Sequence, residues 1–211
     1  MGRILTVSQV DPAEEVLCEA ELVLSSGGVL VMPTDSVYGI GCAAVIGNPA
    51  HERIFVIKRR DRSQTLPWLI ADAGDLEVLA ADVTGRTRRL ADELWPGALT
   101  LVVRASSKVP PEYVASDGTL AVRVPDSMLV RELARRVGPL ATTSANTHGR
   151  EAATSGSAVE SRIAQAADLV LDAGPAPLAQ ASTIVACTEH DILILREGAI
   201  SAARVHEVAG V

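Results

Sequence analysis

The sequence predicts an α/β protein built on a single twisted, mixed β-sheet with helices packed around it. Short apolar runs, long enough for buried strands, recur along the whole chain. Amphipathic segments that begin at capping residues lie between them, so strands and helices alternate. A chain of 211 residues with 48% hydrophobic composition can bury one sizeable core. We predict one domain over residues 1–211.

The predicted strands are bounded by turn-forming residues. They are residues 4–7, expected as a first core strand, and residues 29–32, 66–71, 99–104, 120–124, 140–143, 169–171, 183–186 and 192–195. The run at 29–32 stops at Pro33, which has no backbone N–H to continue a sheet, and is followed by Thr34, Asp35 and Ser36. Polar side chains gathered at the end of a buried strand often form a site.

The predicted helices begin at caps. Residues 11–14 (Asp-Pro-Ala-Glu) match a capping box with proline at the first helical position, and their helix ends at the serines and glycines of 25–28. Asn48 and Pro49 start a helix that finishes in the basic segment 58–62. Further helices are predicted at residues 75–82, 84–95 and 158–166, and after a cap at Asp126.

Charge and cysteine content limit the class of protein. A net charge of −7 argues against a surface that binds nucleic acid throughout, but it leaves room for a basic pocket that takes a small anion. Three cysteines without CxxC spacing predict neither a disulfide framework nor a zinc site and favour a reducing compartment. The apolar runs are too short to span a bilayer. We therefore expect a soluble, cytoplasmic protein.

Polar residues gather at four predicted strand or helix ends. The groups are Thr34, Asp35, Ser36 and Tyr38; Lys58, Arg60 and Arg62; Thr142, Thr143, Ser144 and Asn146; and Arg196. Ligands of open α/β sheets bind at strand ends, so these groups can converge on one crevice. Lysine and arginine would supply charged donors to a polyanion, and serine and asparagine neutral ones. The alternative is that the basic run only complements a helix dipole on the surface.

Arg123 stands alone in the apolar strand predicted at residues 120–124. An arginine in such a run must point to solvent or be paired, because an isolated buried charge is costly. Arg196, which follows residues 192–195, raises the same question. Both are therefore candidate binding residues.

Sequence motifs for covalent or zinc-dependent catalysis are missing. The sequence contains no Walker loop, HExxH, GxSxG or EF-hand pattern, and its four histidines have no metal-ligand spacing. We therefore predict no protein metal site and no enzyme nucleophile.

Seven segments resemble, in order, the signature of the YrdC family, the L-threonylcarbamoyladenylate synthases. They are PTDSVYGIG (33–41), KRR (58–60), PGALT (96–100), VRVP (122–125), SAN (144–146), STIV (182–185) and LR (195–196). Each is short, but together they span most of the chain. The resemblance ends near residue 211, which predicts the short form of the family, without the additional C-terminal domain of longer relatives.

The resemblance implies an ATP-using nucleotidyltransferase. It would join bicarbonate and L-threonine to AMP, release pyrophosphate, and pass the product to a transferase that makes threonylcarbamoyladenosine in tRNA. Mg²⁺ commonly accompanies ATP in such reactions. This chemistry needs positioning and charge neutralisation rather than a nucleophile, which agrees with the motifs present.

The resemblance also implies roles for individual residues. Lys58, Arg60, Ser144, Asn146 and Arg196 would face the triphosphate, the first four as catalytic residues, with Thr119 and Gln64 near the nucleotide. Thr34, Ser36, Arg123, Thr142 and Ser182 would shape the threonine and carbamate pocket, with Arg123 as the partner of a carboxylate. Tyr38 would form a wall.

The sequence departs from the family pattern mostly on the amino-acid side. Ser36 replaces the usual threonine, Leu69 stands where many longer relatives have histidine, and Asp61 and Glu197 replace prolines. Two alternatives therefore stay open: a paralogue that carbamoylates another acceptor, and a non-catalytic module that binds RNA. The net acidity and the few aromatic residues argue against RNA binding.

Overall fold

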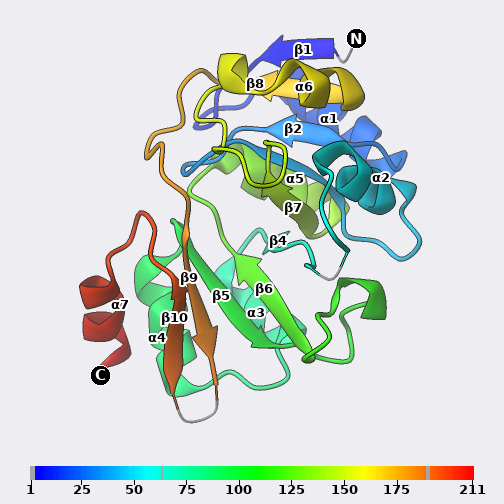
Figure 1. The fold of residues 1–211 in the computed structure, drawn as a ribbon. Coiled ribbons are helices and arrows are strands. Elements are labelled where there is room, and N and C mark those ends of the chain that lie inside the picture. The colour runs from blue at the N-terminus through cyan, green and yellow to red at the C-terminus, as the bar shows by residue number, and fades with distance from the viewer. Residues whose placement is uncertain (1–2, 63, 189–190) are drawn as a thin grey trace.

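A single ten-stranded sheet organises the chain. The computed structural model describes residues 3–62, 64–188 and 191–211, and within them the strand order is β1-β8-β2-β3-β7-β4-β6-β5-β9-β10. β1 pairs with β8 in parallel and β2 with β3 antiparallel, so the sheet is mixed. Helices flank this twisted sheet (Figure 1). The predicted fold class is confirmed.

Most elements lie where the sequence predicts them. The strands are β1 (Arg3–Thr6), β2 (Leu30–Met32), β3 (Gly39–Ala43), β4 (Trp68–Leu69), β5 (Leu99–Arg104), β6 (Thr119–Arg123), β7 (Leu140–Ser144), β8 (Leu169–Asp172), β9 (Thr183–Cys187) and β10 (Ile192–Arg196). The helices are α1 (Glu14–Ser25), α2 (Pro49–Lys58), α3 (Leu76–Leu79), α4 (Gly85–Leu94), α5 (Met128–Val137), α6 (Ser161–Ala166) and α7 (Ala202–Ala209). Short 3₁₀ turns occupy Ala73–Asp75, Pro111–Tyr113 and Gly156–Ala158.

The helix caps give one confirmed prediction and one error. The Asn48 side chain accepts a hydrogen bond from the Ala50 N–H (2.9 Å), so it caps α2 as expected. The capping box at residues 11–14 is wrong, because α1 begins at Glu14 after Ala13 and has no side-chain cap. Asp11 belongs instead to the preceding turn, where its N–H donates to Ser8 Oγ (3.0 Å).

Three strands differ from the expectation. The strand predicted at residues 4–7 is not a core strand, because β1 is a largely exposed edge strand that pairs only with β8 among the described strands. The strand at 66–71 shortens to β4. β3 was not predicted. A Cβ on Gly41 would lie 2.6 Å from Thr142 Oγ1, so glycine permits the close approach of β3 to β7.

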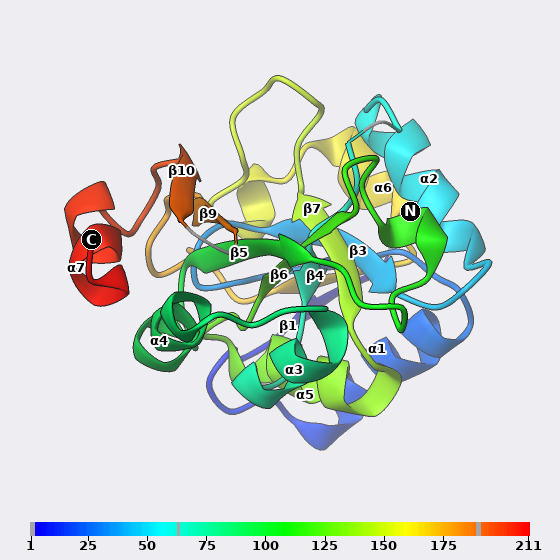
Figure 2. The same cartoon turned by 90° about the horizontal axis from the view of Figure 1, so that it is seen from below.

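The two halves of the sheet are covered differently (Figures 1 and 2). In the half formed by β1, β8, β2, β3 and β7, α1 and α5 cover one face, and α2 and α6 the other. Leu129, Val130 and Leu133 of α5 are fully buried, which stabilises the fold by about 1.5–3 kcal/mol per side chain. In the half formed by β4, β6, β5, β9 and β10, α3 and α4 cover one face, and no helix labelled in the figures covers the other.

Candidate active site

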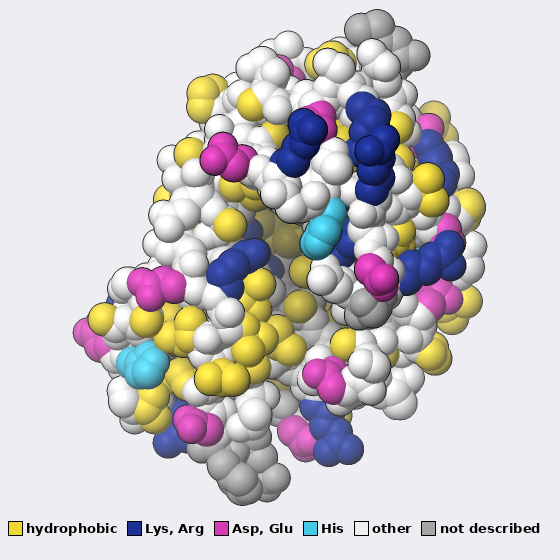
Figure 3. Space-filling model, viewed as in Figure 1, with side chains coloured by type: hydrophobic (Ala, Val, Ile, Leu, Met, Phe, Trp, Pro, Cys, Tyr) yellow, Lys and Arg dark blue, Asp and Glu magenta, His cyan; other side chains and the backbone are white. Residues whose placement is uncertain are grey.

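A cavity of about 370 Å³ opens between the two halves of the sheet. Figure 3 shows the hollow near the centre of one face of the molecule. Its walls come from the loop between β2 and β3, the end of β7, and one end of β6, β9 and β10. At least one member of each of the four predicted polar groups therefore lies at this cavity, although Lys58 and Arg62 are not among its lining residues.

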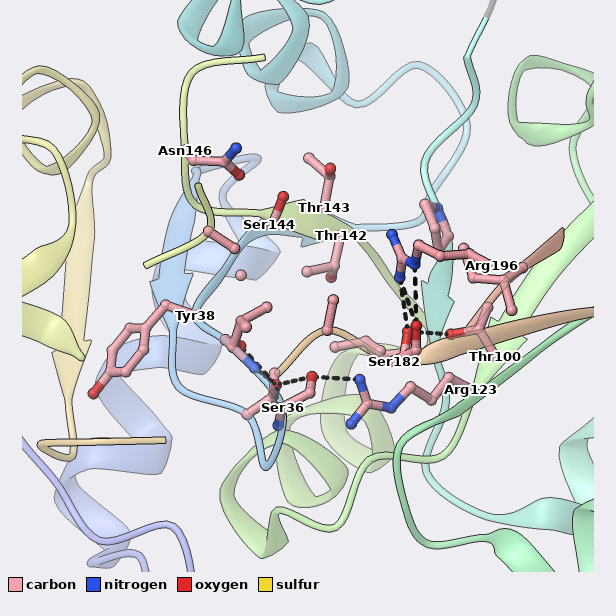
Figure 4. A pocket seen from close by; sticks show the side chains of 18 of the residues that line it. Ser36, Tyr38, Thr100, Arg123, Thr142, Thr143, Ser144, Asn146, Ser182 and Arg196 are labelled. Atoms are coloured by element: carbon pink, nitrogen blue, oxygen red, sulfur yellow. Dashed lines mark hydrogen bonds between the residues drawn. The ribbon is translucent and has the colours of Figure 1, made fainter. Parts of the chain in front are cut away.

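Most of the predicted site residues line this cavity (Figure 4). They are Thr34, Ser36, Tyr38, Arg60, Arg123, Thr142, Ser144, Asn146, Ser182 and Arg196. Lys58, Gln64 and Thr119 are not among the lining residues.

The turn after β2 is held by its own hydroxyl groups. Thr34 Oγ1 donates to the Val37 carbonyl (2.7 Å) and accepts from the Ser36 N–H (3.2 Å). It also lies 3.0 Å from Ser36 Oγ. Such hydroxyl turns are favoured where a strand breaks off, here at Pro33. The result is a rigid, buried pair of hydroxyls on the cavity wall.

Arg123 is the buried arginine of the site. Its Nε donates to the Gly97 carbonyl (2.8 Å), Nη1 to Ser36 Oγ (2.7 Å) and Nη2 to Asp35 Oδ1. The side chains of Arg123 and Asp35 are only 6% and 5% exposed. Burial raises the pKa of the Asp35 carboxyl, although the Arg123 charge acts against this. The sequence predicted that Arg123 either points to solvent or is paired. The structure shows that it is paired and that it lies at the cavity.

Arg60 reaches the cavity from the residues after α2. Nη1 donates to Thr143 Oγ1 (3.0 Å) and Nη2 to the Thr65 carbonyl (3.1 Å), while the buried Nε has no partner in the described part of the chain. Burial lowers the pKa of this guanidinium. No carboxylate among the described residues forms an ion pair with it.

Arg196 lies across the cavity on the bulged end of β10. Its Nη2 and Nε donate to the Ser182 carbonyl at 2.8 and 3.1 Å. Ser182 Oγ in turn lies 2.9 Å from Thr100 Oγ1, and both hydroxyls are buried. This arginine is thus held by neutral oxygens, and its charge is not cancelled by any described carboxylate.

Tyr38 does not form the wall with its ring. In Figure 4 the ring points away from the cavity. Its hydroxyl donates to the Gly174 carbonyl (2.6 Å) and accepts from the Ala173 N–H (3.0 Å). Burial raises the pKa of this phenol to about 12. Tyr38 therefore fixes the segment after β8 to the back of the site.

Lys58 lies behind the cavity wall, and Gln64 and Thr119 do not line the cavity either. The Lys58 side chain is buried in the protein, and its ammonium donates to backbone carbonyls. Gln64 is exposed. Thr119 begins β6, roughly 13 Å along the strand from Arg123, and its hydroxyl donates to Asp117 Oδ1 (2.6 Å).

Sequence reasoning missed two polar residues of the cavity. Arg150 lines it from the loop after β7, with a side chain that is 72% exposed and 3.8 Å from Glu160 Oε2. Thr100 lines it from β5. Arg150 could have been predicted as a site residue, because it is a basic residue close to Ser144-Ala145-Asn146. For Thr100 the only indication was its place in the Pro-Gly-Ala-Leu-Thr segment.

The cavity has the opposite charge to the whole protein. The chain carries a net charge of −7. The described lining residues nevertheless include Arg60, Arg123, Arg150 and Arg196 and no aspartate or glutamate. Low-dielectric walls strengthen this local field, so the site favours an anion.

The described residues contain no cluster of three or more histidine, cysteine, aspartate or glutamate residues that could hold a metal ion. Cys42 is a buried strand residue, and burial raises the pKa of its thiol to about 12, so it is not an activated nucleophile. Nor does the described part of the chain contain a helix long and apolar enough to cross a membrane. Fold and cavity together define an α/β protein with a positively charged, hydroxyl-rich pocket for a small anion.

The chain belongs to the Sua5/YciO/YrdC family, whose family model, described as telomere recombination, matches residues 22–198. A Mycobacterium leprae relative, provisionally named a threonylcarbamoyl-AMP synthase, is 34% identical over 100% of this chain and 96% of its own length. The Bacillus subtilis threonylcarbamoyl-AMP synthase is 31% identical over 92% of this chain.

Solved structures agree with this assignment. Pyrococcus abyssi Sua5 complexed with L-threonine superposes with a TM-score of 0.91 and 31% identity over 98% of this chain. Escherichia coli YciO superposes with a TM-score of 0.85 and 25% identity over 94% of this chain and 96% of its own. The chain spans only 61% of P. abyssi Sua5 and 56% of the B. subtilis protein.

Proposed function

We propose that the protein is a threonylcarbamoyl-AMP synthase that uses ATP, bicarbonate and L-threonine. The observation that carries the proposal is the cavity itself, where the buried Arg123 with its hydroxyl neighbours lies beside Arg60 and Arg196, which no described carboxylate neutralises. The buried arginine with its hydroxyl neighbours suits an amino acid, and the arginines without a carboxylate partner suit a triphosphate. The family membership and the P. abyssi Sua5 complex with L-threonine support the same activity.

Arg123 is proposed to bind the threonine carboxylate. A guanidinium has five N–H donors, and three of those of Arg123 are used by Gly97, Ser36 and Asp35. One N–H on each terminal nitrogen remains, which suits a bidentate carboxylate. The hydroxyls of Thr34, Ser36, Thr142 and Ser182 surround this position and would hold the threonine side chain and the carbamate.

Arg60 and Arg196 are proposed to bind the triphosphate, together with Ser144 and Asn146. Their charges are available to phosphate oxygens because their present partners are neutral oxygens. Arg150 adds a fourth cation from a loop at the rim. The expected contacts of Gln64 and Thr119 with the nucleotide remain predictions, since neither lines the cavity.

The proposed reaction has two steps. The threonine amine adds to the carbon of bicarbonate, and loss of water leaves a carbamate. A carbamate oxygen then forms a bond to the α-phosphorus of ATP while the bond to pyrophosphate breaks, and pyrophosphate leaves with the electron pair. The protein contributes by holding the carbamate against the α-phosphate and by neutralising the leaving pyrophosphate, and neither task needs a nucleophile.

The use of ATP leads us to expect Mg²⁺, but no aspartate or glutamate that could bind it lies on the described cavity wall. A magnesium ion bound with ATP would therefore be held by phosphate oxygens and water, a common arrangement for this ion.

The proposal includes what happens to the product. Threonylcarbamoyl-AMP would pass to a transferase that modifies tRNA, in the cytoplasm that the free cysteines favour. Direct tRNA binding by this chain is not required.

Pyrophosphate release tests the proposal. Purified protein is given ATP, bicarbonate and one amino acid at a time, and pyrophosphate and the adenylate are measured. We expect pyrophosphate only when both bicarbonate and threonine are present. Equal release with an unrelated amine would favour the paralogue with another acceptor, and RNA binding without any pyrophosphate would favour the non-catalytic module.

A further inference from the structure

We propose that Lys58 is a positioning residue, whose ammonium holds the turn formed by Ser144, Ala145 and Asn146 (the 144–146 turn) in the shape that faces the ligand. This differs from the direct phosphate contact that the sequence suggested. The inference uses the proposed function only to name the ligand as a triphosphate.

The Lys58 ammonium contacts oxygen atoms of the 144–146 turn. Lys58 is the last residue of α2 and is only 1% exposed. Its Nζ donates to the Ser144 carbonyl and to the Asn146 carbonyl (2.6 Å), with Asn146 Oδ1 at 3.5 Å. A lysine ammonium has three donors, and these three oxygens surround it. No donor is left for a phosphate in the cavity.

The backbone joins the same two segments. The Lys58 carbonyl accepts from the His148 N–H (3.0 Å), so the end of α2 holds the 144–146 turn through its side chain and the chain just after this turn through its main chain. Arg59 follows in the left-handed conformation and ends the helix. The 144–146 turn is therefore fixed to α2 rather than free to move with a ligand.

Asn146 connects the 144–146 turn to the loop at the cavity rim. With Oδ1 toward Lys58, its Nδ2 donates to the Arg150 carbonyl (2.6 Å) and to the Thr147 carbonyl (3.1 Å). Arg150 lines the cavity. One buried lysine thus sets the orientation of the Asn146 amide, and through it the path of the loop that carries an arginine to the site.

The charge of Lys58 suits a fixed structural role. Burial lowers its pKa to about 8, assisted by the nearby Arg60 charge and opposed by Glu160. The group is thus mostly protonated at neutral pH and can hold carbonyl oxygens, which a neutral amine would hold less well.

Amine labelling of the wild-type protein tests the inference directly. The sequence contains only two lysines, Lys58 and Lys108, and Lys108 is exposed, so it serves as an internal control. Ligand-free protein is treated briefly with acetic anhydride, and both sites are quantified by mass spectrometry. We expect Lys58 to react at least about tenfold more slowly than Lys108 and ATP to add no further protection. Reaction of Lys58 at the rate of Lys108, with protection only by ATP, would overturn the inference.

A pair of neighbouring variants supplies the second measurement. In ligand-free Lys58→Met, amide hydrogen exchange of residues 144–150 should rise at least about tenfold, whereas Arg60→Met should leave it near the wild-type rate. Lys58→Met should weaken ATP and pyrophosphate by similar factors, because the whole turn moves. Unchanged exchange in Lys58→Met, with affinity lost only for the triphosphate, would identify a direct ligand instead.

Neither measurement requires turnover. If pyrophosphate release fails while Lys58 stays protected and exchange in Lys58→Met rises, the proposed function is wrong and this inference stands. If Lys58→Met does not fold, the labelling of the wild-type protein decides alone.

Discussion

The cavity holds two kinds of arginine. Arg123 is buried with Asp35 and forms three hydrogen bonds inside the protein. Arg60 and Arg196 are held only by neutral oxygens among the described residues. The charge of Arg123 is therefore largely cancelled, whereas the other two charges remain available.

This difference between the arginines explains how one pocket can hold two anions of unequal charge. A paired guanidinium with a fixed orientation presents its N–H donors in a defined geometry, which suits a single planar carboxylate. Unpaired guanidiniums offer net charge, which a triphosphate needs. The two ends should therefore respond differently to mutation: the paired end in stability and amino-acid binding, the unpaired end in nucleotide turnover.

The largest effect is expected from Asp35→Asn. The substitution keeps the shape but leaves the buried Arg123 without its counter-charge, and breaking a buried ion pair in this way costs about 3–5 kcal/mol. Urea unfolding measures the loss. Arg60→Ala serves as the comparison and should change the free energy of unfolding by less than about 1 kcal/mol. Equal stability of Asp35→Asn and wild type would mean that the pair is not formed.

Arg60→Ala should instead lose activity. A charged hydrogen bond in a shielded site contributes up to about 3 kcal/mol, so kcat/KM for ATP should fall by a factor of about 100 or more. Thermal unfolding provides the control for folding. A fully active variant would show that Arg60 only complements the dipole of α2 as part of the basic segment after this helix.

Arg123→Lys should separate the two substrates. Lysine keeps a positive charge but lacks the planar fork, so one carboxylate contact is lost and the KM for threonine should rise about tenfold, well beyond any rise for ATP. The assay is run well below the unfolding temperature, because the Asp35 pair is also weakened. Equal weakening of both substrates would assign the arginine to the nucleotide or to the fold.

The fold was predictable wherever local pattern decides it. The apolar strand from Leu99 to Arg104 has the predicted limits, and Asn48 caps the predicted helix. β3 could not be predicted, because Gly39 and Gly41 indicate a turn by composition and form a strand only where β7 approaches closely. The short helix α7 at the C-terminal end was missed as well.

The site was predictable in its location and less so in its details. Thr34, Ser36, Thr142 and Ser144 stand at breaks in apolar runs, and that local signal placed them together correctly. The direction of a long side chain depends on the packing of other segments. The resemblance therefore named Lys58 and Tyr38 but could not reveal that the Lys58 ammonium turns inward or that the Tyr38 ring faces residues 172–174.

The smallest effect is expected from Ser36→Thr, which restores the threonine usual in the family. Ser36 Oγ accepts from Arg123 Nη1 (2.7 Å), and a threonine hydroxyl can keep this bond while its methyl adds an apolar contact beside the amino-acid position. One methyl alters binding by roughly 1 kcal/mol, so the ratio of kcat/KM for threonine to that for serine should rise several-fold. The KM for ATP should stay constant, because the change lies at the paired end of the cavity. If the ratio is unchanged and only stability shifts, Ser36 acts on Arg123 alone, and threonine selectivity must come from other residues of the pocket such as Thr142 or Ser182.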